Sequence, residues 1–86
     1  MQKFDYTIND PMGLHARPAG IVVKAINKVP CNVKISYNNK TIDGKRLFAI
    51  MSLGVTTGET ITVTCEGECE KETADLIKRI FVAENL

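Results

Sequence analysis

Hydrophobic and polar residues alternate in four short stretches of the chain, and each stretch is predicted to form a β-strand with one buried face. The first is residues 3–8, in which Phe4, Tyr6 and Ile8 share a side. The others are residues 31–37, 40–42 and 59–65. The Asn38-Asn39 pair between the second and third stretches predicts a tight hairpin, because asparagine tolerates positive φ.

Three further stretches carry apolar residues at spacings of three and four, which is typical of amphipathic helices. They are residues 16–28, 46–53 and 70–83. Pro18 lies in the first turn of the first helix, where its missing N–H is tolerated, and Pro30 marks the stop. Gly54 is the expected C-terminal stop of the second helix.

The predicted order of elements is therefore β-α-β-β-α-β-α, an α+β class in a single domain spanning residues 1–86. The first strand–helix–strand unit should cross over right-handed. That crossover leaves a gap between the first two strands, where the fourth strand can insert antiparallel to both. The helices are expected to cover one face of the sheet, and the other face would be open to water.

Composition narrows the classes of function. The net charge is +1, with 11 basic and 10 acidic residues, so a strong non-specific nucleic-acid or membrane-surface binder is not supported. No apolar run is long enough to span a bilayer, and residues 1–5 lack the apolar stretch of a secretion signal. We therefore expect no membrane insertion and a cytoplasmic location.

The three cysteines, Cys31, Cys65 and Cys69, are an odd number and too scattered for a disulfide framework. Cys65 and Cys69 are four residues apart, but no further ligand cluster joins them. A metal site there stays open as the minor alternative. Reduced, structural thiols are the favoured interpretation, and no metal is expected.

The only histidine, His15, follows Gly13 closely and directly precedes the first predicted helix. The first amides of a helix lack internal partners and carry partial positive charge, so they can bind a phosphoryl group. If His15 caps this helix, its ring lies beside the amides of Ala16 and Arg17. Neutral imidazole is a nucleophile near neutral pH, and the Arg17 guanidinium can bind phosphate oxygens. These parts suit a transient phosphohistidine.

The simpler alternative is that His15 is a polar surface residue or an improvised cap, and that Arg17 is an ordinary solvated charge. No second base or carboxylate is expected near the histidine. The chain also shows no Ser/His/Asp set, glycine-rich phosphate loop or paired acids, so a self-contained catalyst is poorly supported. A group that accepts and hands on a phosphoryl is better supported, and no cofactor is expected.

Two motifs resemble those of HPr, the histidine-containing phosphocarrier of the bacterial sugar phosphotransferase system. The run Gly13-Leu14-His15-Ala16-Arg17-Pro18-Ala19 is similar to the active-site motif of that family. Ile50-Met51-Ser52-Leu53-Gly54 is similar to its second conserved segment. The length and the order of elements also agree, so the resemblance covers the whole chain.

The resemblance implies an open-faced β-sandwich, with a four-stranded antiparallel sheet covered on one side by three helices. Enzyme I, phosphorylated by phosphoenolpyruvate, would pass its phosphoryl group to Nδ1 of His15. The carrier would then donate the group to IIA domains of sugar permeases, and Arg17 would neutralise phosphate charge during transfer.

The family also implies a docking patch made by Leu47, Phe48 and Met51 beside the histidine. Phe48 does not share the inward stripe of the second helix, so we expect it to be exposed, as suits a transient interface. The alternative for Leu47 and Met51 is burial in the core.

Two positions depart from the family pattern. Arg46 replaces the regulatory serine that many HPr proteins of low-GC Gram-positive bacteria carry there, so that phosphorylation switch should be absent. Ser52 does not replace it, because it belongs to the second motif. Met12 stands where the family commonly has a small polar residue. Both changes leave open a regulatory paralogue, in a nitrogen branch or as a partner-binding module, without sugar flux. An inert scaffold is the third alternative, and a shuttle of this kind is expected to be a monomer.

Overall fold

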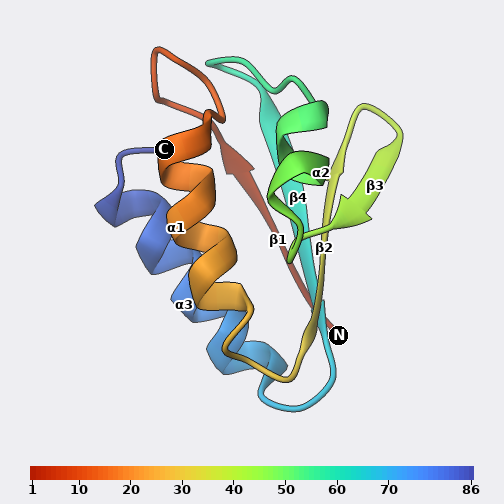
Figure 1. Ribbon diagram of the computed structural model, residues 1–86. Helices are drawn as coiled ribbons and strands as arrows, with labels where there is room; N and C mark the ends of the chain where they lie inside the picture. The colour runs from red at the N-terminus through yellow and green to blue at the C-terminus, as the bar shows by residue number, and fades with distance from the viewer.

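The computed structural model describes residues 1–86 and contains one four-stranded sheet in the order β1-β4-β2-β3 (Figure 1). The strands are β1 (Gln2–Thr7), β2 (Asn32–Tyr37), β3 (Lys40–Asp43) and β4 (Thr60–Glu66). β4 pairs antiparallel with both β1 and β2, so the predicted insertion of the last strand between the first two is confirmed.

Three helices lie against one face of this sheet: α1 (Ala16–Ile26), α2 (Leu47–Ser52) and α3 (Glu70–Ala83). The predicted class, an open-faced β-sandwich with three helices, is confirmed. The helix boundaries differ by at most two residues from those predicted. No helix is long and apolar enough to cross a membrane.

The core lies between the sheet and the helices, and it is almost wholly aliphatic. β4 shows the reason most clearly, because Ile61, Val63 and Cys65 are buried on the helix side while the residues between them face outward. On the outer face, the Thr62 hydroxyl donates to Asp5 over 2.7 Å. Alternation in the sequence therefore sets which face of the sheet is covered.

The Asn38-Asn39 turn between β2 and β3 has φ values of 50° and 67°, which confirms the predicted tight hairpin. Two positive φ values in succession match the twist of a two-residue hairpin loop. Lys45, in the loop before α2, makes two hydrogen bonds to the loop that follows α1. Its Nζ donates to the Val29 carbonyl over 3.0 Å, and its backbone carbonyl accepts a hydrogen bond from the Asn27 side chain over 3.1 Å. These bonds tie the end of α1 to the beginning of α2.

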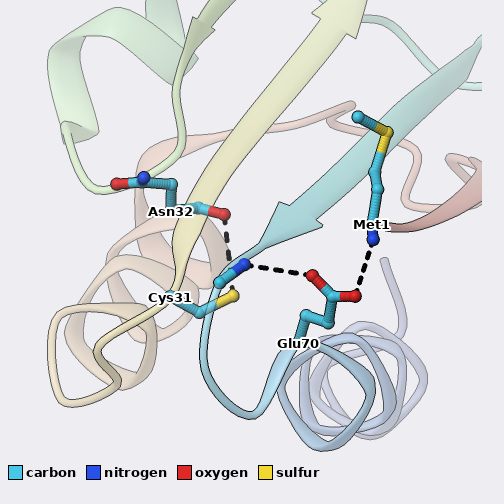
Figure 2. Close-up of polar contacts among 5 residues, drawn as sticks. Met1, Cys31, Asn32 and Glu70 are labelled. Atoms are coloured by element: carbon cyan, nitrogen blue, oxygen red, sulfur yellow. Dashed lines mark hydrogen bonds and ion pairs between the residues drawn. The ribbon is translucent and has the colours of Figure 1, made fainter.

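Cys31 lies near the N-terminal Met1 (Figure 2). The other two cysteines lie near the same end, because Cys65 pairs with Gln2 of β1 and Cys69 directly precedes Glu70, the partner of Met1. Cys31 and Cys65 are buried, and burial raises the pKa of the Cys65 thiol to about 11, whereas Cys69 is exposed. Glu70 accepts hydrogen bonds from the Met1 amino group over 2.6 Å (Figure 2) and from the Gly67 amide over 3.0 Å. No group of three or more histidine, cysteine or acidic side chains is arranged so that it could hold a metal ion.

Candidate functional site

A tight turn after β1 brings the chain to the start of α1. The Gly13 amide donates to the Asp10 carbonyl over 2.8 Å, with Pro11 at the second position of the turn. Gly13 has φ +70°, and a Cβ atom there would lie 2.5 Å from the Val55 carbonyl oxygen. Glycine is therefore required twice over, by the left-handed backbone and by the close approach.

The second motif, residues 50–54, leads into Val55, which contacts the turn that precedes His15. Gly54, with φ +65°, ends the α2 segment and turns the chain into Val55. The Val55 carbonyl then accepts the Leu14 amide over 3.0 Å and is the atom against which Gly13 packs. The two motifs that carry the resemblance are thus joined through one carbonyl, immediately before His15.

His15 is the N-cap residue of α1, as the sequence predicted. Its backbone is extended, with φ −99° and ψ 173°, and its carbonyl accepts the Ala19 amide over 3.1 Å. Its ring makes no capping hydrogen bond. The amides of Ala16 and Arg17 have no acceptor within the protein, and Pro18 has no amide hydrogen. Two unpartnered donors therefore remain at the positive end of α1.

A carboxylate lies directly beside the histidine, so the prediction that none would be near was wrong. Oδ2 of Asp10 is 2.9 Å from Nε2 of His15, and the side chains of Asp10 and His15 are 17% and 25% exposed. Oδ1 of Asp10 accepts the Met12 amide over 2.9 Å. These two contacts, the Met12 amide first, hold the pKa of Asp10 below its usual value.

The site opens to solvent through a hollow of about 220 Å³ lined by Asp10, His15, Arg17, Pro18 and Glu84. Arg17 is exposed and forms no salt bridge with either carboxylate. Its guanidinium is consequently not committed to another group of the protein. Glu84 reaches this hollow because the end of α3 and the C-terminus lie beside the beginning of α1 (Figure 1).

The three residues of the predicted docking patch differ in exposure. Phe48 is 87% exposed, as expected, whereas Leu47 and Met51 are half-buried and pack against the core. A hollow of about 550 Å³ beside α2 is lined by Ile42, Asp43, Arg46, Leu47, Phe48 and Ala49. Leu47 and Met51 therefore serve the core in part, and Phe48 contributes most of the accessible apolar surface.

The whole chain resembles proteins of one kind. Residues 2–83 match the family described as the PTS HPr component, phosphorylation site. The chain belongs to the HPr family. The phosphocarrier protein HPr of Buchnera aphidicola is 41% identical over 74 residues, which cover 86% of this chain and 87% of that protein.

Solved structures of the family share the fold. The histidine-containing phosphocarrier protein of a mycoplasma is 32% identical, with a TM-score of 0.96 over 99% of this chain and 97% of that one. The catabolite repression protein Crh of Bacillus subtilis is 29% identical, with a TM-score of 0.76 over 100% of this chain and 99% of that one, and its structure is a swapped dimer. This HPr-family chain thus has the architecture of phosphocarriers of the phosphotransferase system.

Two residues of the site were not foreseen from the sequence. Asp10 carried a usable signal, because an aspartate before a proline favours a turn that folds its side chain back onto the chain. Glu84 carried no such signal, because only the packing of α3 against α1 brings it to the hollow.

Proposed function

We propose that this protein is a phosphocarrier in which His15 accepts a phosphoryl group from phosphorylated Enzyme I and donates it to IIA domains of sugar permeases. The observation that supports this most directly is the position of His15 at the N-cap of an eleven-residue helix with two unpartnered amides. A protein that only relays a phosphoryl group needs one nucleophile, donors for the phosphate and an accessible surface.

In the forward step, the lone pair on Nδ1 of His15 attacks phosphorus in line with the donor atom of Enzyme I. The new P–N bond forms as the bond to the donor breaks, and the electron pair of the broken bond stays with the donor. The amides of Ala16 and Arg17 are then suited to donate hydrogen bonds to equatorial phosphate oxygens at the positive end of α1. Donation to a IIA domain reverses this sequence.

Arg17 supplies the positive side chain of the proposed site. Its guanidinium is exposed, lines the hollow with His15 and has no ion-pair partner. A planar fork of donors can bind two oxygens of one phosphoryl group. The charge that spreads over the equatorial oxygens during transfer is thereby compensated.

Leu47, Phe48 and Met51 form the proposed docking patch for Enzyme I and the IIA domains. Phe48 is its anchor, because exposed aromatic side chains commonly dominate the energy of transient interfaces. Arg46 and Arg17 are exposed and basic, so we infer that the partner surfaces are acidic. We further propose that residues 1–86 act as one domain, as a monomer and in the cytoplasm.

The proposal is tested by incubating the chain with phosphoenolpyruvate and Enzyme I. One acid-labile phosphate should appear on the wild-type protein and be absent from His15→Ala. Ser52→Ala is the matched control, because Ser52 is another exposed nucleophile and its loss should leave phosphate incorporation unchanged. Phosphate that persists in His15→Ala, or that is acid-stable, would rule the assignment out.

The docking patch is tested separately by titrating labelled protein with Enzyme I and with a IIA domain. Phe48→Ala should raise Kd at least about tenfold, a difference of roughly 1.4 kcal/mol. Val82→Ala is the matched control, because Val82 is 66% exposed but lies on α3. Equal Kd values for the two variants would place the interface elsewhere.

A regulatory paralogue without sugar flux is the second candidate. Arg46 and Met12 depart from the family pattern and are both exposed, Met12 at 74%, so they alter the surface that is available to partner proteins. The Crh protein of Bacillus subtilis, named for catabolite repression, shows the same fold. Transfer from the phosphorylated chain to a panel of sugar-specific IIA domains separates the two candidates, because rapid transfer to any of them argues against a purely regulatory role.

A further inference from the structure

The Asp10 carboxylate is held rigidly against the imidazole of His15 at a point that no part of the proposed transfer step yet uses. Its Oδ2 atom is 2.9 Å from Nε2 of His15. Its Oδ1 atom accepts the Met12 amide over 2.9 Å. The Asp10 backbone is fixed as well, because its amide donates to the Leu86 carbonyl over 3.0 Å and its carbonyl accepts from Gly13.

We propose that Asp10 is a positioning residue that keeps the proton of neutral His15 on Nε2 and thereby leaves the lone pair on Nδ1. This inference rests on the proposed function of His15 as phosphoryl acceptor. An ionised carboxylate can only accept hydrogen bonds, so the ring nitrogen facing it must be the one that carries hydrogen. The lowered pKa of Asp10 keeps the carboxylate ionised at neutral pH.

The proton need not move during transfer. When the Nδ1 lone pair forms the P–N bond, the electron pair of the broken bond leaves with the donor and the hydrogen stays on Nε2. The ring then carries a positive charge, which faces the carboxylate 2.9 Å away. The same contact assists the return step, because a protonated ring is the better leaving group when phosphorus passes to the next acceptor.

Asp10 has two contacts, and they make one substitution especially informative. In Asp10→Asn, the Met12 amide still requires an acceptor, so the amide oxygen of asparagine should occupy the position of Oδ1. The NH₂ group then faces Nε2 of His15 as a donor, which requires Nε2 to accept and places the ring proton on Nδ1. Asparagine also supports the same turn, so the fold should be preserved.

The experiment is ¹⁵N NMR of the imidazole ring in the unphosphorylated chain, at a pH where the ring is neutral. We expect hydrogen on Nε2 in the wild type and a shift toward hydrogen on Nδ1 in Asp10→Asn. Glu84→Gln is the matched control, because it removes a negative charge from the same hollow without a hydrogen bond to His15. Its tautomer should equal that of the wild type.

Transfer rates complete the test. Asp10→Asn should slow phosphorylation by Enzyme I about tenfold or more, since a wrong tautomer removes the nucleophilic lone pair. Asp75→Asn, at an exposed aspartate of α3 that does not line the hollow, should leave the rate unchanged. An unchanged tautomer in Asp10→Asn, or hydrogen on Nδ1 in the wild type, would overturn the proposal. A tautomer shift in a chain that never accepts phosphate would instead overturn the proposed function and leave the role of Asp10 on the ring intact.

Discussion

The hydroxyl of Tyr37, at the end of β2, donates a hydrogen bond to the carboxylate of Glu59, just before β4. The other oxygen of Glu59 accepts both the amide and the hydroxyl of Thr56, each over 2.7 Å. The Ile8 amide donates to the Glu59 carbonyl over 2.8 Å. One glutamate therefore joins the sheet to the loop that leads from Val55, which supports the candidate site.

This pair predicts that stability falls at both extremes of pH. The hydroxyl of Tyr37 and the two donors of Thr56 lower the pKa of Glu59 below its usual 4.5, so its stabilising contribution is present above that pH and is lost as pH falls further. Glu59 in turn raises the pKa of Tyr37 above 10, so the contribution of Tyr37 is present below pH 10 and is lost as pH rises beyond it.

Urea denaturation at about pH 3, 7 and 11 measures both effects. Tyr37→Phe should remove this alkaline loss and reduce the acid loss. Glu59→Gln keeps an acceptor oxygen for Thr56 but does not ionise, so its acid loss should be smaller than that of the wild type. Parallel pH profiles for all three proteins would show that the pair does not control stability.

Thr73 of α3 is the one buried side chain whose polar atom has no partner, with 2% exposure and an unpaired Oγ1. Burying an unpaired hydroxyl is unfavourable, so Thr73→Val should raise the unfolding free energy by about 1 kcal/mol. Thr64→Val is the control, because Thr64 lies on the open face of the sheet and its hydroxyl is not buried in the core. Thermal unfolding that shows no gain, or a loss, for Thr73→Val would contradict this account.

Arg46 occupies the N-cap position of α2 without the side chain that the position favours. Its backbone is extended, with φ −118° and ψ 110°, but it makes no side-chain cap hydrogen bond. Serine can accept an amide of the first turn, and replacing arginine also removes a positive charge from the positive end of the helix. Arg46→Ser should therefore stabilise the fold by about 1 kcal/mol. Thermal unfolding measures this effect, and Arg46→Ala should raise the unfolding free energy much less than Arg46→Ser. An equal increase in both variants would show that the loss of charge, rather than capping, stabilises the helix.

The spacing of hydrophobic residues in the sequence was sufficient to predict the order and packing of the strands and helices. Alternation in residues 59–65 predicted which side chains of β4 are buried, and the crossover rule predicted where that strand inserts. The helical period and Pro18 located the start of α1 at His15. These features depend on local pattern and chain topology, which a single sequence records.

The contacts within the candidate site were harder to predict from the sequence, because they depend on how separate loops pack together. The carboxylate of Asp10 reaches His15 only after the turn at Gly13 is closed, and that turn is supported by Val55 from a distant segment. Cys65 and Cys69 show the same limit, since their spacing of four spans the end of a strand and the start of a helix, and one is buried while the other is exposed. Sequence spacing does not fix distance across such junctions.

Arg17 provides the last prediction, because its proposed role is electrostatic and its structural role is small. It is exposed at the second position of α1 and forms no salt bridge, so Arg17→Ala should change the unfolding free energy by no more than about 0.5 kcal/mol. Phosphoryl transfer from Enzyme I should slow about tenfold or more, and Arg17→Lys should recover only part of the rate, since an ammonium group cannot bind two oxygens in one plane. Arg79→Ala, an exposed arginine on α3, controls for loss of net charge in rapid-quench transfer assays. A collapse of stability in Arg17→Ala with a normal transfer rate would make Arg17 a structural residue.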